Sequence, residues 1–305
     1  MDWTQFDHLV EAYLPDLKMA HDEPMSRHTS FRIGGPAARM AFPVKAEQVV
    51  LLQGLAEACE VKTLVIGNGT NLLVADEGLD CLVIDTSEMN VIRIEEDGVT
   101  LTADAGVSLA RLADFACKQG LTGLEFAHGI PGTLGGAVCM NAGAYGGEMK
   151  QVITTVVLMD PAEGIRVLSG EEMQFGYRRS LLNDLPEAIV LSASVKLEQG
   201  DPEAIRGTMR ELMGKRKASQ PLEWPSAGST FKRPEGYFAA ALIDKCGLKG
   251  FTVGGAQVSE KHAGFVINQG GATCADVLEL MRQVQQRVYD EKGVRLEPEV
   301  RIVGV

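Results

Sequence analysis

Two stretches of this 305-residue chain are rich enough in glycine to suggest that backbone amides bind a ligand there. The first is IGNGTNLL, residues 66–73, and the second covers residues 128–148, with seven glycines and three alanines in 21 positions. Each glycine costs backbone entropy on folding, so such density usually serves a close approach of N–H groups to something, often a phosphate. Two interpretations remain open: loops that cradle a phosphate, or glycine-rich turns packed tightly between domains.

Neither loop matches a common nucleotide-binding motif. Gly67-Asn68-Gly69 has no third glycine at the spacing of a Rossmann fingerprint, and the LVADEG that follows shows no helical stripe. The sequence G-x-x-x-x-G-K-[ST] of a P-loop does not occur. If the two loops bind a diphosphate, they do so as two separate backbone nests.

Three polar side chains outside these loops could do chemistry, although each also has a plain structural interpretation. The motif AGST, which contains Ser229, is typical of a polar turn. A loop position would also let the Ser229 hydroxyl face a cleft. Arg178 in YRRS reads as a surface ion-pairing residue. Glu299 alternates with apolar residues in EPEVRIV, as an exposed cross-strand residue does. The residues alone do not decide between structure and catalysis.

The elements that must position these residues start as an α/β arrangement. Apolar residues at helical spacing predict helices over residues 3–14 and 46–60. Short β-branched runs predict strands at 63–67 and 81–85. Because helix and strand alternate, the opening region, 1–85, is expected to form an α/β domain.

A β-rich region follows, with strands in the runs VIRI, VTLTADA, VITTVVLMD, IRVL and AIVLSASVKL. Its one clear helix has Ser108 as N-cap and ends at Gly120, a glycine expected in the left-handed conformation. We assign residues 86–200 to this second domain.

The third region, 201–305, opens with a charged helix at 203–217. Its last helix begins at Thr273, with Asp276 as capping partner, and stops at Gly293. We therefore expect three domains, with boundaries near residues 85 and 200.

Composition excludes several classes of protein. The 29 Lys and Arg against 41 Asp and Glu give a net charge of −12, which argues against nucleic-acid or anionic-membrane partners. The six cysteines never come closer than 22 residues, so neither a structural metal nor an iron–sulfur cluster is expected. An acidic N-terminus and the lack of an apolar run near the roughly 18 residues of a membrane span predict a cytoplasmic protein in a reducing compartment.

Seven motifs together resemble one known family, that of the UDP-N-acetylenolpyruvoylglucosamine reductases. The motifs occur in the family's order and span nearly the whole chain: TSFRIGGPA (29–37), IGNGTNLLV (66–74), IPGTLGGAVCMNAGAYG (130–146), FGYRRSLL (175–182), PSAGSTFKRP (225–234), KHAGFVIN (261–268) and EPEVRIVG (297–304). The short spacing between YRRS and AGST is similar to the subtype that lacks an extra loop over the substrate pocket.

The resemblance implies a fold class, a mixed α/β and α+β fold. It is the FAD-binding fold of the vanillyl-alcohol-oxidase (PCMH) type, with two α/β subdomains and a C-terminal α+β substrate-binding domain. It also implies non-covalent FAD, NADPH as hydride donor, and reduction of UDP-N-acetylglucosamine-enolpyruvate to UDP-N-acetylmuramate for peptidoglycan. Two alternatives stay open: an FAD-dependent oxidase with another substrate, and a non-catalytic UDP-sugar or flavin binding protein. The latter would have no need for Ser229, Arg178 and Glu299 together.

The resemblance also implies roles for single residues. Ser229 would be the general acid that protonates the substrate, Arg178 would hold the enolpyruvyl carboxylate, and Glu299 would join Arg178 at the enolate. The FAD loops would be formed by Gly67, Asn68, Gly69, Thr70, Asn71, Gly129, Pro131, Gly132, Gly135, Gly136, Ala137, Asn141, Gly143, Ala144 and Gly146.

Substrate contacts are implied for Lys232, Arg233 and His262. Ser219 stands where many relatives have Lys, so no phosphate contact is assigned to it.

Overall fold

The computed structural model describes residues 2–305, and the chain divides into two compact units. The first unit holds the chain up to His21 together with Arg39–Asn68 and Cys81–Gly214, and the second holds Asp22–Ala38, Gly69–Asp80 and Lys215–Val305. Two segments near the N-terminus, 22–38 and 69–80, therefore pack with the C-terminal residues. The three-domain division at 85 and 200 stays a prediction.

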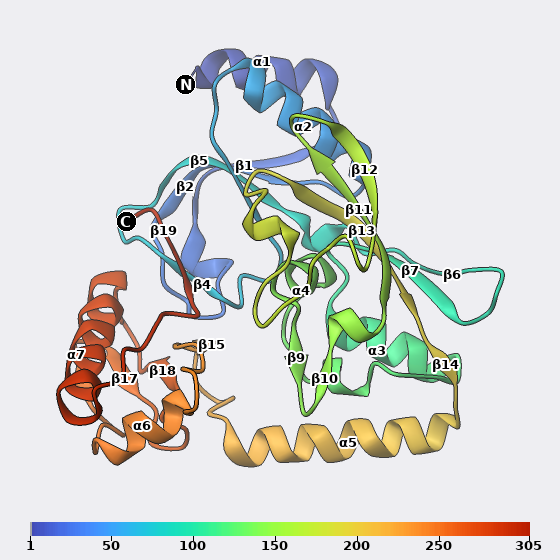
Figure 1. Cartoon of the computed structure of the whole chain (residues 1–305). Coiled ribbons are helices and arrows are strands. Elements are labelled where there is room, and N and C mark those ends of the chain that lie inside the picture. The colour runs from blue at the N-terminus through green and yellow to red at the C-terminus, as the bar shows by residue number, and fades with distance from the viewer. Residues whose placement is uncertain (1) are drawn as a thin grey trace. The chain divides into compact units, whose positions relative to one another are not determined.

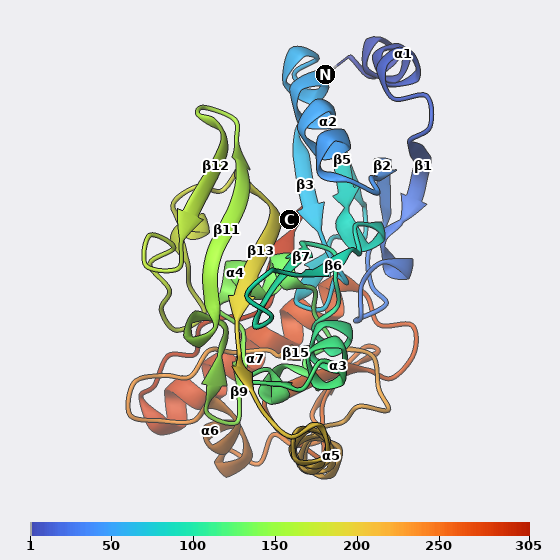
Figure 2. The same cartoon turned by 90° about the vertical axis from the view of Figure 1, so that its right-hand side faces the viewer.

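A four-stranded sheet in the order β1-β2-β5-β3 lies beside two helices, α1 and α2 (Figure 2). Strands β3 and β5 are parallel, and both predicted helices and both predicted strands are confirmed. Apolar residues of the two helices, among them Phe6 and Leu52, are fully buried against the sheet residues Leu82 and Ile84. The elements are α1 (Trp3–Tyr13), α2 (Ala46–Ala58), β1 (Lys18–Pro24), β2 (Pro36–Phe42), β3 (Thr63–Ile66) and β5 (Leu79–Asp85).

A second sheet of the first unit is five-stranded and antiparallel, in the order β12-β11-β13-β7-β6 (Figure 2). All five predicted strand runs are confirmed. The strands are β6 (Ile92–Ile94), β7 (Thr100–Asp104), β11 (Ile153–Asp160), β12 (Gly164–Ser169) and β13 (Ile189–Lys196), with the short pairs β8 (Leu121–Thr122) with β14 (Glu198–Gln199) and β9 (Gly143–Ala144) with β10 (Gly147–Glu148).

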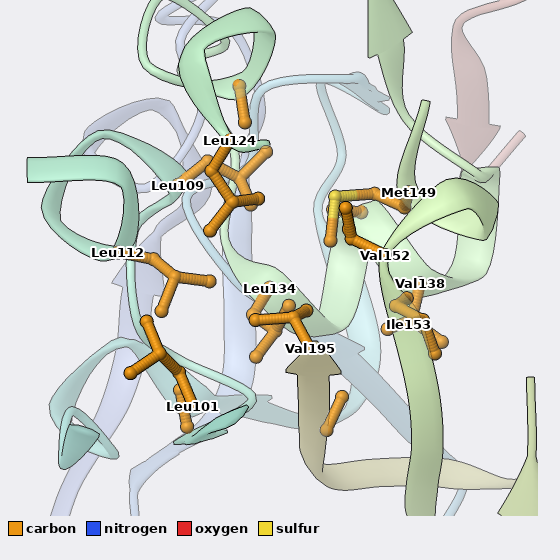
Figure 3. Close-up of a cluster of buried hydrophobic side chains, with 14 of the residues drawn as sticks. Leu101, Leu109, Leu112, Leu124, Leu134, Val138, Met149, Val152, Ile153 and Val195 are labelled. Atoms are coloured by element: carbon orange, nitrogen blue, oxygen red, sulfur yellow. The ribbon is translucent and has the colours of Figure 1, made fainter. Parts of the chain in front are cut away.

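Two helices, α3 (Leu109–Lys118) and α4 (Leu134–Met140), share the hydrophobic core of this sheet. Leu101, Leu109, Leu112 and Leu134 are fully buried, and Figure 3 shows their side chains in one cluster. Burying a leucine side chain stabilises a fold by about 1.5–3 kcal/mol, so this cluster is a main source of stability.

The ends of α3 lie where the sequence predicts them. The Ser108 hydroxyl accepts the N–H of Arg111, and Gly120 has a φ of 70°. Both the N-cap and the left-handed stop are therefore confirmed.

The second unit contains an antiparallel sheet in the order β15-β18-β17-β16, with α6 and α7 beside it (Figure 1). The predicted capping box of α7 is confirmed, because Thr273 and Asp276 exchange side-chain to N–H hydrogen bonds, and Gly293 has a φ of 67°. The elements are β4 (Leu72–Val74), β15 (Ser226–Ser229), β16 (Thr252–Val253), β17 (Ala256–Val258), β18 (Phe265–Asn268), β19 (Arg301–Val303), α6 (Ala239–Lys245) and α7 (Cys274–Lys292).

Strand β19 pairs in parallel with β4, which lies more than two hundred residues earlier in the chain. The predicted charged helix at 203–217 is confirmed as α5 (Pro202–Ser219). Within residues 2–305, no helix combines the length and the apolar character needed to cross a membrane.

Candidate active site

The two glycine-rich stretches meet inside the first unit. The side-chain amide of Asn68 donates to the carbonyl oxygen of Pro131 at 3.0 Å. A side chain at Gly67 would collide with the hydroxyl of the buried Thr133. Glycine at 67 therefore serves close loop packing, and this packing joins residues 66–68 to residues 129–133.

Helix α4 begins within the second stretch, for which the sequence predicts a loop. Its first residues are fixed to the segment before α3, because Leu134 and Gly135 donate N–H hydrogen bonds to Val107 and Ala105. A methyl group at Gly135 would press on the Cβ of Ala105 at 3.0 Å, so packing explains this glycine. The signal that could have revealed the helix is the pair of fully buried residues Leu134 and Val138, four positions apart.

Two features of this region fit a bound group such as FAD. Gly136 lies in the first turn of α4, where glycine costs about 0.5–1 kcal/mol relative to alanine. An added methyl there would meet only the Thr133 hydroxyl, at an ordinary 3.7 Å, so protein packing does not require this glycine. In addition, the buried Nδ1 of His128 has no hydrogen-bond partner among residues 2–305. A ligand against the loop would account for both features.

The stretch ends in a tight hairpin of β9 and β10. Its central residues Tyr145 and Gly146 both have positive φ, 54° and 89°, as a type I′ turn requires. Gly143 and Ala144 form the first strand of this hairpin. Asn141, just before the hairpin, ends α4 in the left-handed conformation and is 2% exposed.

The remaining residues of the first loop belong to the second unit. Gly69, with a φ of 57°, accepts the N–H of Ser30 and leaves no room for a side chain beside the carbonyl of His28. The amide of Asn71 donates to the carbonyl oxygen of Glu299 at 3.0 Å. The carbonyl of Asn71 accepts the N–H of Arg301. Asn71 therefore helps to fix the segment that carries Glu299, just before β19, a role that the sequence did not reveal.

Ser229 and Glu299 lie on neighbouring segments of the second unit. Lys232 donates its N–H to the carbonyl of Glu297 at 2.9 Å, and Glu299 donates its N–H to the carbonyl of Thr230 at 2.8 Å. These two bonds form a short antiparallel ladder. Both Ser229 and Glu299 are half-buried. The structure thus brings together the segments that carry two of the three expected catalytic residues.

Thr230 joins three segments at this point, and sequence reasoning missed it. Besides accepting the N–H of Glu299, it donates its own N–H to Gly264, and its hydroxyl accepts the N–H of Val266 at 3.0 Å. Thr230 is 4% exposed. The signal that could have indicated this role is a β-branched polar residue placed between Ser229 and the buried Phe231. Thr230 holds Ser229, Glu299 and the loop of His262 in one hydrogen-bonded set.

Arg178 belongs to the first unit and occupies a tight turn. Gly176 and Arg179 exchange backbone hydrogen bonds of 2.9 and 3.3 Å, which leaves Tyr177 and Arg178 as the central residues. Arg178 has a φ of 54°, a conformation that costs a non-glycine residue about 1–2 kcal/mol. Its guanidinium carbon lies 5.4 Å from the centroid of the Tyr177 ring.

The neighbouring arginine is engaged differently. Arg179 forms an exposed ion pair with Asp184, with 2.8 Å between Nη2 and Oδ2. The two adjacent arginines thus have distinct environments.

The expected substrate-binding residues all lie in the second unit. Lys232 pairs loosely with Glu297 at 3.5 Å, and the Arg233 guanidinium carbon lies 4.5 Å from the centroid of the Phe238 ring. Ser219, at the end of α5, donates its hydroxyl to the carbonyl of Lys215 within the helix.

The ring of His262 has a defined tautomer. Its Nδ1 accepts the N–H of Gly264 at 3.1 Å, so the ring proton resides on Nε2. The ring also packs edge-on against Phe265, with 5.0 Å between centroids. Burial lowers the pKa of His262, and the positive charge of Lys249 lowers it further. With Nδ1 used as an acceptor, the ring's one hydrogen-bond donor is on Nε2.

Comparisons with known proteins agree with this arrangement. Residues 220–303 match the family model of the UDP-N-acetylenolpyruvoylglucosamine reductase C-terminal domain, and residues 37–169 match that of an FAD binding domain. UDP-N-acetylenolpyruvoylglucosamine reductase of Caldanaerobacter subterraneus is 49% identical over 97% of each chain. The enzyme of that name from Clostridium perfringens is 45% identical over 99% of this chain and 98% of the other.

Solved structures give the same result. The crystal structure of UDP-N-acetylenolpyruvylglucosamine reductase from Thermus caldophilus aligns with a TM-score of 0.80 and 36% identity, over 94% of this chain and 98% of the other. An alkyldihydroxyacetonephosphate synthase aligns with a TM-score of 0.50 over 65% of this chain and 41% of the other, and at 17% identity this likeness shows the fold alone. The expected fold class is confirmed.

Proposed function

The chain belongs to the family of UDP-N-acetylenolpyruvoylglucosamine reductases, and from this premise we propose that Arg178, Ser229 and Glu299 carry its reaction. The protein is an oxidoreductase of peptidoglycan synthesis that uses FAD and NADPH. When bound, FAD transfers hydride from NADPH to the enolpyruvyl group. The protein's own groups must therefore bind the substrate, stabilise charge and deliver a proton.

The residues proposed to hold FAD are those of the two glycine-rich stretches. The Asn68–Pro131 hydrogen bond, the unexplained glycine at 136 and the unpartnered Nδ1 of His128 support this assignment in the first unit. From the first unit we assign Gly67, Asn68, Gly129, Pro131, Gly132, Gly135, Gly136, Ala137, Gly143, Ala144 and Gly146, and from the second Gly69, Thr70 and Asn71.

Arg178 is the proposed partner of the substrate carboxylate. A planar guanidinium binds a carboxylate through two parallel hydrogen bonds, which a lysine ammonium cannot do. Hydride addition to the terminal carbon leaves negative charge on the carbon that bears the carboxylate, and this charge spreads into the carboxylate. A fixed cation there stabilises the transition state more than the ground state.

Ser229 is the proposed proton donor to that same carbon. A hydroxyl is a weak acid, but a carbanion is a strong base, so the transfer is favourable once the charge develops. One hydride and one proton together convert the carbon–carbon double bond to a single bond. Water then returns a proton to Ser229. Glu299 is proposed to act beside Arg178 at the enolate.

The observation that carries this proposal is the ladder in which Glu299 donates its N–H to Thr230, the residue after Ser229. It supports a common site for these two residues. Lys232, Arg233 and His262, all in the same unit, are proposed to bind UDP-N-acetylglucosamine-enolpyruvate. The exposed Lys232–Glu297 pair is weak enough to open for a phosphate.

We further propose that the enzyme works in the cytoplasm, a location that its six free cysteines support.

Stopped-flow absorbance of Ser229→Ala tests the proposal, because it follows each half-reaction separately. NADPH should still bleach the flavin at a near-normal rate. Product formation from the enolpyruvyl substrate should fall by about 10²- to 10⁴-fold, the usual cost of losing a positioned acid. Equal slowing of both half-reactions would instead assign Ser229 to the shape of the site, and an unchanged second half-reaction would assign the proton to another donor.

A further inference from the structure

Asn141 lies in the stretch that resembles an FAD loop, yet the polar atoms of its side chain already bind protein groups. Its Nδ2 donates to Glu148 Oε2 at 3.0 Å and to the carbonyl oxygen of Gly176 at 3.1 Å. Its Oδ1 accepts the N–H of Lys150 at 2.9 Å. A side-chain amide has two N–H donors, and both are used here. The side chain is also 2% exposed, so it has no N–H to offer a cofactor.

The bond to Gly176 is the one with consequences for the reaction. Gly176 is the first residue of the turn that carries Arg178, and it closes that turn by pairing with Arg179. We propose that Asn141 is a positioning residue, which fixes this turn so that Arg178 is held in its working orientation. The inference rests on the role proposed for Arg178.

A second hydrogen bond anchors the other side of the same turn. Ser180 is fully buried, and its hydroxyl donates to the carbonyl oxygen of Cys139 at 2.9 Å. Cys139 and Asn141 both lie at the end of α4. The turn is thus attached to α4 on each side, through Gly176 and through Ser180.

The conformation of Arg178 explains why anchoring is needed. A φ of 54° is unfavourable for arginine, so an unanchored turn would relax to other conformations. Relaxation would move the guanidinium, and a misplaced charge-stabilising group loses much of its effect on the transition state. Two anchors on a strained turn are the arrangement expected for a preorganised cation.

The variant Asn141→Gly tests the proposal, because glycine accepts the left-handed φ of 42° at this position but has no amide. In the holoenzyme we expect the substrate half-reaction to slow at least tenfold. The NADPH half-reaction and the Kd for FAD should change less than threefold. In the apoprotein, amide hydrogen exchange over residues 174–182 should become faster. A matched control is Gln174→Gly, which relieves another positive φ, 48°, and should leave both half-reactions unchanged.

A second variant covers the case in which Asn141→Gly folds poorly. In the double variant Asn141→Asp with Glu148→Gln, the glutamine amide restores the bond between positions 141 and 148, and the aspartate still accepts the Lys150 N–H. The donor to Gly176 is lost, a carboxylate oxygen faces the Gly176 carbonyl oxygen in its place, and the surface ion pair between Lys150 and position 148 is lost as well. This protein should show the same slow substrate half-reaction.

A double-mutant cycle with Arg178→Ala distinguishes action through Arg178 from any other effect. If Asn141 acts through Arg178, Asn141→Gly has no further effect on the substrate half-reaction once Arg178 is alanine. The same slowing in both backgrounds, or a weakened affinity for FAD with both half-reactions slowed, would overturn the inference. A normal substrate half-reaction in Arg178→Ala would remove the proposed role of Arg178 itself. A slow Arg178→Ala beside a normal Asn141→Gly would remove only the role of Asn141.

Discussion

The backbone N–H of Glu299 donates to the carbonyl oxygen of Thr230 at 2.8 Å, and Ser229 immediately precedes Thr230. A main-chain bond therefore sets the spacing of the two segments. Substitutions of the Ser229 or Glu299 side chain leave this bond in place. Their effects on turnover can accordingly be read as effects on chemistry.

The hydroxyl of Thr230 should contribute to stability out of proportion to its size. In Thr230→Val the shape is kept, but the buried N–H of Val266 loses its acceptor, which costs about 1–3 kcal/mol. Thr230→Ser keeps the acceptor and loses only a methyl group, worth about 1 kcal/mol. Urea unfolding of the apoprotein checks both values. A valine variant at least as stable as the serine variant would contradict the importance of this hydrogen bond.

The geometry of the Arg178 side chain, beyond its charge, should matter for catalysis. Arg178→Lys keeps a cation but loses the two-point contact with a carboxylate, so we expect the substrate half-reaction to slow by more than tenfold, or about 1.4 kcal/mol. Arg179→Lys is the matched control, because Arg179 pairs with Asp184 at the surface. Stopped-flow reoxidation of the reduced enzyme provides the measurement. A slow Arg179→Lys with a normal Arg178→Lys would reverse the assignment of the two neighbours.

Gly136 should be important for the binding of FAD and dispensable for folding. Because the protein leaves room for a methyl group, Gly136→Ala should raise apoprotein stability by up to about 1 kcal/mol while weakening FAD binding. Gly135→Ala is the contrasting variant, since its methyl group would press on Ala105 and lower stability. Thermal unfolding of apoprotein and fluorescence titration with FAD measure the two properties. An unchanged FAD affinity in Gly136→Ala would remove this residue from the cofactor site.

The lowered pKa of His262 should make the free energy of unfolding depend on pH. Because burial lowers the pKa in the folded state, the unfolded chain takes up a proton first as pH falls below the ordinary value of about 6.5. The free energy of unfolding should therefore decrease from about pH 7 downward, until the lowered folded-state pKa is passed.

His262→Asn should remove this part of the pH dependence, because asparagine Oδ1 can still accept the Gly264 N–H but does not titrate. His8→Asn, at an exposed position, serves as the control. Denaturant unfolding at a series of pH values measures the effect. If the two variants show equal pH profiles, His262 does not couple to folding in this way.

The parts of the fold that sequence predicted well are those fixed by local chemistry. The ends of α3 and α7 follow from Ser108, Thr273 and Gly293, whose side chains or backbone freedom act within a few residues. Helix α4 was missed because Gly135 and Gly136 lower its intrinsic propensity, and burial of Leu134 and Val138 overrides that preference.

For the candidate site, motif resemblance indicated residues but not the contacts that hold them. Nothing local in the sequence indicates that Asn141 binds Gly176 or that Asn71 binds Glu299, because partners 35 and 228 residues apart are chosen by the tertiary fold. The left-handed φ of Arg178 is equally hidden, since that conformation is unfavourable for arginine alone.

The parallel pairing of β4 with β19 has a consequence for the order of events on the ribosome. Leu73, Phe31 and Ile33 share their core with Leu296 and Val300, which are made much later. Leu72 and its β19 partner Arg301 are 301 − 72 = 229 residues apart, which at about 5–20 residues per second corresponds to roughly 10–45 seconds of translation. Throughout that interval the nascent chain presents an apolar strand and two large side chains without their final partners. Chaperones that shield nascent chains should therefore engage the N-terminal quarter of this protein for longer than they engage α3 or its sheet.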